Sequence, residues 1–235
     1  MASGPGSRFW HSLERSKFDG PIAMLRILPL CLSLAAPAFG QSPIEAWGDD
    51  GYGQVSNTPS SSDFDEVSGG SAHALALKTD GSIVSWGRDN YGQISDTPSG
   101  TLFAQVEGGC GSHSLALKVD GSVVAWGQDN VGQVSNTPGG NDFIQVAGGY
   151  YHSLALKTNG AIVSWGNDAF GQVANTPTTN DFEQISGGAQ HSLALRNNGS
   201  IASWGADTYG QVSNTPTGND FVQVAGGGLH SLALK

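Results

Sequence analysis

The stretch W-G-Q-D-N-V-G-Q-V-S-N-T-P, residues 126–138, opens a unit that this chain repeats five times. The unit continues with D-F-I-Q-V-A-G-G at 142–149 and H-S-L-A-L-K at 152–157. The tryptophan that begins each copy recurs at intervals of 39, 40, 39 and 39 residues, at Trp47, Trp86, Trp126, Trp165 and Trp204. A fixed period of this length predicts supersecondary units that stack or surround an axis.

Four short strands fit into each copy. In the third copy we expect them at Phe143–Val146, His152–Lys157 and Ala161–Trp165, with a fourth after a loop at Gln172–Asn175. Asn159-Gly160 lies between two of these runs and predicts a two-residue type I′ hairpin turn. Four antiparallel strands per forty residues predict an all-β fold of five propeller blades. A β-helix is the alternative, although its coils are usually shorter, and the 35 glycines disfavour a helical repeat.

The two ends of the repeat region are complementary parts of one blade. The chain enters the first unit at its third strand, Ile44–Trp47, and stops at a second strand, His230–Lys235. Pairing of Ile44–Trp47 beside Ser231–Lys235 would close a five-bladed ring and remove its exposed sheet edges. The alternative is an open, truncated part of a longer, seven-bladed propeller.

Residues 1–40 differ in kind from the repeat domain, residues 41–235. They contain basic residues, an apolar run at 27–38 that is too short to cross a bilayer, and the small residues Ala38 and Gly40. This order predicts a secretory signal peptide that is cut before Gln41, with translation starting at Met1 or Met24. We therefore expect a secreted or periplasmic protein without a membrane span in its mature form.

The charge balance of the repeat domain excludes some partners. Eighteen acidic and six basic side chains follow residue 40, which gives a net charge of −12. Nucleic acid is not expected as a partner, because its binding depends on clustered lysine and arginine. Cys110 is the one cysteine after residue 40, so no disulfide can form within that domain.

Residues that recur at one position of every unit predict architecture more readily than chemistry. We interpret the tryptophans as wedges between blades rather than as ligand platforms. The histidines are interpreted as structural residues bonded to backbone rather than as metal ligands; they are His73, His113, His152, His191 and His230. The aspartates that follow each tryptophan predict Asx turns, with calcium as the alternative. No pairing of nucleophile and base is visible, so we expect neither an enzyme nor a bound metal or cofactor.

The motifs W-G-x-D-x-x-G-Q and G-G-x-x-H-S-L-A-L and the D-G turn make residues 44–235 resemble the regulator of chromosome condensation family. That resemblance implies a propeller, usually of seven copies, and its eukaryotic founder is a chromatin-binding exchange factor for a small GTPase. This chain departs from that founder, because it has five copies, an export signal and an acidic balance. Secreted bacterial members are a nearer comparison, and one type inhibits β-lactamases through one face. We therefore expect a non-catalytic, exported binding or scaffolding module, with an inhibitor of an extracellular enzyme and an exchange factor-like regulator as alternatives.

Two stretches vary most between copies: the residues before each repeated histidine and those after each Trp-Gly. Both lie at the same end of an up-and-down blade, so they should crowd one face of the disc. Recognition is often carried by loops on a rigid scaffold. We expect this face to bind a protein or a glycan through Tyr52, Tyr91, Tyr150, Tyr151, Phe170, Tyr209 and Arg88. The competing interpretation is neutral variation in solvated loops.

Overall fold

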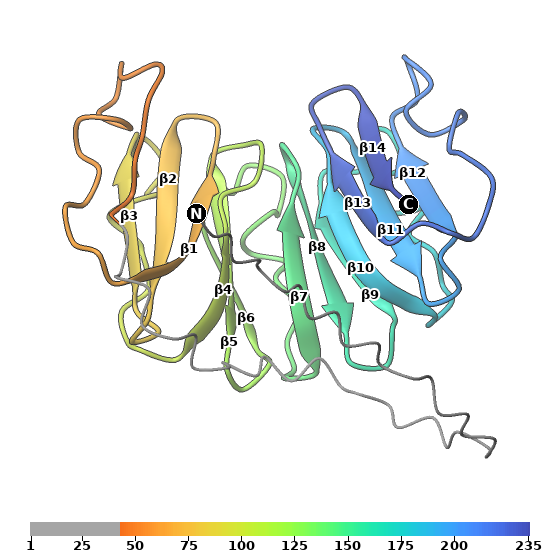
Figure 1. The fold of residues 1–235 in the computed structure, drawn as a ribbon, viewed down its shortest axis with the longest axis horizontal. Helices are drawn as coiled ribbons and strands as arrows, with labels where there is room; N and C mark the ends of the chain where they lie inside the picture. Colours follow the sequence, from red (N-terminus) through yellow and green to blue (C-terminus); the bar gives the residue numbers. More distant parts are fainter. Residues whose placement is uncertain (1–42) are drawn as a thin grey trace, which may run out of the picture. The chain divides into compact units, whose positions relative to one another are not determined.

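The computed structural model describes residues 43–235, and every regular element in that range is a β-strand. Four sheets have three antiparallel strands each and a fifth has two (Figure 1). The strands are β1 (Phe64–Gly69), β2 (His73–Lys78), β3 (Ile83–Gly87), β4 (Phe103–Glu107), β5 (His113–Lys118), β6 (Val123–Gly127), β7 (Phe143–Gly148), β8 (His152–Lys157), β9 (Ile162–Gly166), β10 (Phe182–Gly187), β11 (His191–Arg196), β12 (Ile201–Gly205), β13 (Gln223–Gly226) and β14 (Ser231–Leu234). The all-β prediction is confirmed, whereas the predicted signal peptide lies outside the described residues.

The hairpin between the second and third strands of each unit closes on three residues instead of the predicted two. In the third unit Lys157 N donates to Ala161 O at 2.8 Å and Gly160 N donates to Lys157 O at 2.9 Å, so residues 158–160 form the loop. Gly160 has a φ of 83°, which fits a type I turn followed by a left-handed residue. Glycine is needed there, because a Cβ would lie 2.5 Å from the carbonyl oxygen of Asn180 in the next unit.

The predicted fourth strand of each unit is absent from the described residues, and a helical turn takes its place. Asn175 N donates to Gly171 O at 3.2 Å, which bends the chain at the segment expected to be extended. Asp168 Oδ1 accepts the backbone N–H groups of Val173 and Ala174 at 2.8 Å each, so neither is free for a sheet ladder. The blades are therefore three-stranded, because one repeated carboxylate competes with strand pairing.

The core lies between neighbouring sheets and has a similar composition at the three boundaries between three-stranded sheets. Between the second and third units, Leu115 and Leu117 of β5 pack against Phe143, Val146 and the indole of Trp165. The tryptophan indoles also donate to the preceding unit: Trp126 to Gln93 O, Trp165 to Gln133 O and Trp204 to Gln172 O, each at 2.9 Å. Trp126, Trp165 and Trp204 are buried in the apolar clusters between sheets, and Trp86 of the first sheet is buried with its Nε1 donating to Gln54 O at 2.9 Å.

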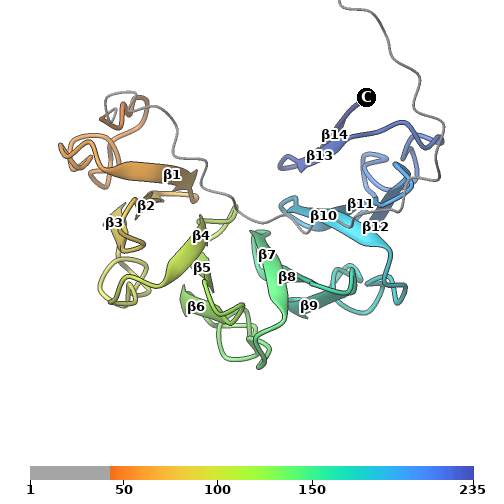
Figure 2. The same cartoon turned by 60° about the horizontal axis from the view of Figure 1, so that its bottom comes forward.

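Ring closure is not observed. Residues 44–47 form no strand, and the indole of Trp47 is 85% exposed. Within the described range β13 pairs only with β14, which leaves the last sheet with two strands. Figure 2 shows the five sheets following one another around an arc, with the first and last sheets at its two ends. The open arrangement that the sequence left as the alternative is the one that these residues adopt.

Candidate partner-binding face

Backbone hydrogen bonds bring the two variable stretches of each unit together. The residue after Trp-Gly donates to the residue before the repeated histidine: Arg88 N to Ala72 O, Gln128 N to Ser112 O, Asn167 N to Tyr151 O and Ala206 N to Gln190 O, at 2.8 to 2.9 Å. These bonds fix both stretches at the same end of each three-stranded sheet. We call the surface formed by residues 49–54, 71–72, 88–93, 110–112, 128–133, 150–151, 167–172, 189–190, 206–211 and 228–229 the loop face.

Aromatic side chains project from the loop face. Those of the segments after Trp-Gly are exposed, as is the first of the two tyrosines in the third unit; the exposed set is Tyr52, Tyr91, Tyr150, Phe170 and Tyr209. Tyr151 is half-buried, and its ring packs edge-on against Tyr150 with 4.5 Å between the centroids. The guanidinium of Arg88 lies 4.8 Å from the centre of the Tyr52 ring, which links the first two copies by a cation–π contact.

Neighbouring phenols influence each other on this face. Burial, together with the phenols of Tyr150 and Tyr91, raises the pKa of Tyr151 above its ordinary value. Tyr91 belongs to the loop after β3, whereas Tyr150 and Tyr151 precede β8, so phenols of two different units share one environment. The Tyr151 hydroxyl, like any tyrosine hydroxyl, is protonated at neutral pH and can donate a hydrogen bond.

Buried glutamine side chains accept hydrogen bonds from the backbone of the aromatic loops. Tyr91 N donates to Gln93 Oε1 at 2.7 Å, and Phe170 N donates to Gln172 Oε1 at 2.7 Å. Both glutamine side chains are almost fully buried. These are contacts that the sequence analysis missed, although the glutamine recurs seven residues after every repeated tryptophan and its recurrence was the available signal.

The repeated aspartates fix the same loops. Asp89 Oδ1 accepts Ile94 N at 2.8 Å and Ser95 N at 3.1 Å, and these bonds lower the pKa of the Asp89 carboxyl. The corresponding oxygen of Asp207 accepts Val212 N and Ser213 N in the same way. This geometry differs from the predicted Asx turn, because the carboxylate accepts N–H groups five and six residues further on rather than two. Among residues 43–235 no group of three or more histidine, cysteine or carboxylate side chains could hold a metal ion.

The repeated histidines bond to side chains of the next sheet, so the backbone partner expected from the sequence was wrong. His113 Nε2 lies 2.9 Å from Ser153 Oγ, and His152 Nε2 lies 2.9 Å from Ser192 Oγ. His73 and His191 make the same contact with Ser114 and Ser231, whereas His230 in the last sheet is exposed. Burial lowers the pKa of His113 to about 4, which keeps its ring neutral. The four buried imidazoles therefore act as neutral links between neighbouring sheets.

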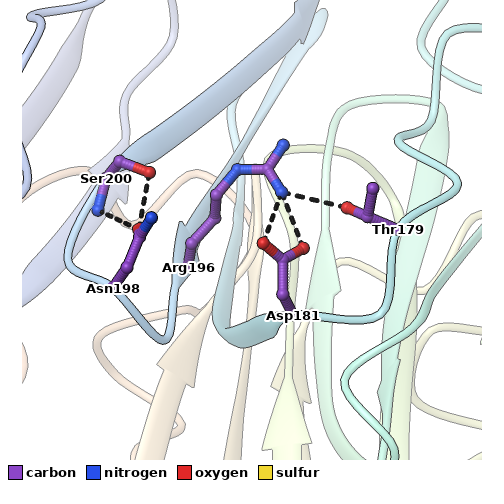
Figure 3. Close-up of polar contacts among 5 residues, drawn as sticks. All are labelled: Thr179, Asp181, Arg196, Asn198 and Ser200. Carbon is purple, nitrogen blue, oxygen red and sulfur yellow. Dashed lines mark hydrogen bonds and ion pairs between the residues drawn. The ribbon is translucent and has the colours of Figure 1, made fainter.

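At the opposite end of the sheets, a lysine or arginine forms an ion pair with an aspartate in four of the five units. Arg196 Nη1 donates to Asp181 Oδ1 at 2.6 Å and to Thr179 Oγ1 at 2.9 Å (Figure 3). Equivalent ion pairs occur in three other units, as Lys78–Asp63, Lys157–Asp142 and Lys235–Asp220. The second unit has Leu102 in place of the aspartate, and Leu102 is exposed. A comparison of the copies at this position would have found this break in the pattern.

The inner strands also bond across the sheets. Gln105 Oε1 accepts Val146 N at 2.9 Å, while Gln105 Nε2 donates to Val146 O at 3.1 Å. The first unit has Glu66 at this position, and it accepts Val106 N at 3.1 Å. Burial raises the pKa of Glu66 and also that of Cys110, whose thiol is consequently less reactive than a free one.

The sequence comparison identifies the family of these repeats. The regulator of chromosome condensation (RCC1) repeat matches residues 64–93, 103–133, 143–172 and 182–211, which together make up just over half of the chain. The chain belongs to the RCC1 repeat family. No curated protein matches the chain significantly in sequence. No helix long and apolar enough to span a bilayer occurs in the part of the chain that the structure describes.

Solved structures with the same fold include propellers from plants, yeast and human. The ectodomain of the receptor kinase CR4 from Physcomitrella patens has a TM-score of 0.66 at 23% identity, covering 82% of this chain and 57% of the other. Prp20p from Saccharomyces cerevisiae has a TM-score of 0.62 at 20% identity, and the match covers 74% of this chain and 57% of Prp20p. Human WBSCR16 has a TM-score of 0.62 at 20% identity, and the match covers 83% of this chain and 65% of WBSCR16. The chain thus spans less than two thirds of the length of each of these proteins.

Proposed function

We propose that this protein is a non-catalytic recognition module that binds a protein partner through the loop face. Exposed aromatic side chains on hydrogen-bonded loops carry the proposal, because tyrosine and arginine are favoured contact residues at interfaces. Their loops are already ordered by Gln93 and Asp89, so little conformational entropy is lost on binding. Four of the five repeated histidines, His73, His113, His152 and His191, are buried and engaged with serines, so these four contribute no reactive group to this surface.

A protein is favoured over a glycan by the relatives of the fold. One of the similar structures is described by the binding of Prp20p to Gsp1p and histones, and another is yeast RCC1 bound to Kap60. The same loop face would serve an inhibitor that covers an extracellular enzyme. Exchange activity on a GTPase is a weaker candidate, because at 20% identity the likeness extends only to the fold.

Replacing Tyr150 and Tyr151 together by alanine is expected to weaken partner binding at least tenfold, on the order of 1.4 kcal/mol or more for a central aromatic pair. The melting temperature should stay unchanged within about 2 °C, because one ring is exposed and the other half-buried. Affinity capture from the native envelope or medium supplies the partner, and calorimetric titration measures the loss. The double phenylalanine variant is the matched control, since it keeps both rings and removes only the hydroxyl groups. A large loss of thermal stability in the alanine variant would instead assign this pair a structural role.

We further propose that the mature protein is exported and begins at Gln41. The basic start, the short apolar run at 27–38 and the small residues before Gln41 support this proposal. Amino-terminal sequencing of protein recovered outside the cytoplasm should therefore read Gln-Ser-Pro-Ile-Glu. Recovery of the uncut chain in the cytoplasm would contradict export and would favour an exchange factor-like role.

A further inference from the structure

The second unit lacks the ion pair that the other four units contain. In those four units a lysine or arginine pairs with the aspartate that stands just before a repeated phenylalanine. Leu102 stands at this position in the second unit, and Val119 N donates to Leu102 O at 2.8 Å. In the third unit Thr158 N donates to Asp142 O at 2.7 Å in the same way. The second unit has therefore changed a side chain on a backbone that follows the pattern.

The change leaves Lys118 without a carboxylate partner among residues 43–235. The four equivalent cations each pair with an aspartate and lie 4.5 to 5.8 Å from the centre of a phenylalanine ring; they are Lys78, Lys157, Arg196 and Lys235. Within the described range Lys118 makes neither contact, and it is half-buried. An ammonium in this situation can accept a carboxylate from outside the chain.

The aspartate of the adjacent turn does not replace the missing one. Asp120 Oδ1 accepts Ser122 N at 2.9 Å and Ser122 Oγ at 2.6 Å. The first unit contains the same turn, and there Lys78 pairs with Asp63 although Asp80 is present. The turn aspartate is thus a part of the hairpin in both units rather than the ion-pair partner of the lysine.

Two exposed apolar side chains lie beside this lysine. Leu102 is 67% exposed and Val119 is 69% exposed, and the hydrogen bond between their backbones makes them neighbours. The equivalents of Val119 are polar in three other units, as Thr79, Thr158 and Asn197. Both apolar replacements thus occur in one unit and at one point of its surface, next to the unpaired ammonium.

These side chains line a groove on a rigid part of the sheet, which we call the second-unit groove. Its lining includes Ser99, Thr101, Leu102, Phe103, Lys118 and Val119. Phe103 begins β4 and lies opposite Lys118, the last residue of β5, in the antiparallel ladder. The ring of Phe103 is buried in the apolar cluster between the first two sheets. The groove therefore exists before any ligand binds.

We propose that the second-unit groove binds a peptide segment of a partner protein in which one aspartate or glutamate is flanked by apolar side chains. The carboxylate takes the position of the missing aspartate and pairs with Lys118, while an apolar neighbour covers Leu102 and Val119. The hydroxyl groups of Ser99 and Thr101 line the same groove and can donate to the carboxylate. The net charge of −12 after residue 40 repels strongly acidic chains, so a single carboxylate among neutral residues fits best.

The second-unit groove is separate from the loop face. It is formed where β4 begins and β5 ends, whereas residues 110–112 of the loop face connect the end of β4 to the start of β5. The two surfaces thus lie at opposite ends of the same strands. A peptide in the groove leaves the loop face free, so the chain can hold two partners at once.

A synthetic probe peptide, acetyl-Gly-Leu-Asp-Leu-Gly-amide, tests the proposal on the full chain by nuclear magnetic resonance. We expect saturable shifts of the Leu102, Lys118 and Val119 amides, with a dissociation constant of about 1 mM. The same peptide with asparagine in place of aspartate should bind at least about fivefold more weakly, and raising the salt should weaken only the aspartate peptide. No saturable binding, or equal binding of the two peptides, would overturn the proposal.

Leu102→Asp is the sharpest variant, because it restores the residue that four other units have at this position. Its carboxylate should pair with Lys118 and reduce binding of the aspartate peptide at least about fivefold without lowering the melting temperature. Lys118→Met is the complementary variant, since it keeps the length of the side chain and removes the charge. It should make the aspartate and asparagine peptides bind alike. Peptide binding that Leu102→Asp leaves unchanged would contradict the proposed site.

Two further results separate this groove from other surfaces. Replacing Tyr150 and Tyr151 together by alanine should leave binding of the probe peptide unchanged, so a failure of the loop-face proposal does not affect this one. Self-association of the full chain that Leu102→Asp abolishes, without any binding of the peptide, would identify a second copy as the occupant and overturn the proposal.

Discussion

Lowering the pH from 7 to 5 is expected to destabilise the folded protein by several kcal/mol. Burial lowers the pKa of His73 and His113 to about 4 and that of His152 to about 3. The unfolded chain, with pKa values near 6.5, therefore takes up protons in this range that the folded chain cannot accept. The stability that these neutral rings contribute is complete above pH 6.5 and is lost as the pH falls toward 4.

The size of this effect follows from the number of buried rings. At pH 5 His73, His113 and His152 should each lower the free energy of unfolding by about 2 kcal/mol, which makes a total of about 6 kcal/mol. This is a large fraction of the free energy of unfolding of a typical protein, which is about 5–15 kcal/mol. Urea unfolding at pH 7, 6 and 5 measures the slope. Glu66 and Glu107 act in the opposite direction, because burial raises their pKa values and the stability linked to their protonation is lost as the pH rises.

A single substitution serves as the control for the acid effect. His113→Gln removes one of the four buried histidines whose pKa burial lowers, so the slope of stability against pH should fall by about a quarter to a third between pH 6 and 5. The substitution lowers stability at pH 7, because Ser153 loses its partner. A stability that is constant from pH 7 to pH 5 in the wild-type chain would contradict the neutral buried state of these histidines.

The sequence predicts the strands and the core well because both depend on local pattern. The alternation in His152–Lys157 and the Asn-Gly turn are enough to place β8 and β9, and the period places the tryptophans. The fourth strand was predicted wrongly because a run such as Gln172–Asn175 has the composition of a strand. Its N–H groups are instead taken by Asp168, and the competition between that side chain and a sheet ladder is not visible in the composition.

The contacts between units are harder to derive from the sequence. That each histidine finds a serine of the next sheet depends on the angle and offset between blades, which a period does not specify. Closure of the ring is equally hard to predict from the sequence. Complementary ends suggest a ring, but the curvature of the row of sheets decides whether one can form. The positions on the loop face followed from strand order alone, whereas the identity of a partner depends on surface chemistry that no internal repeat constrains.

Replacing Trp165 by alanine is expected to cost about 3–5 kcal/mol of unfolding free energy, the usual range for a buried aromatic side chain. The indole is 4% exposed and packs between the second and third sheets, where its Nε1 donates to Gln133 O. The substitution removes this packing and leaves a buried carbonyl oxygen without its donor. Denaturant unfolding at low protein concentration measures the loss.

Trp47→Ala is the matched control, because the same residue type at the same position of the repeat is 85% exposed. Its effect on the monomer should lie within about 0.5 kcal/mol. Repeat arrays couple through nearest-neighbour boundaries, so weakening the second boundary should also divide the unfolding of the Trp165→Ala variant into two transitions. If Trp47→Ala cost the monomer as much as Trp165→Ala, the first indole would be buried in solution and the ring closed. A loss below about 1 kcal/mol for Trp165→Ala would instead mean that the indoles do not hold neighbouring sheets together.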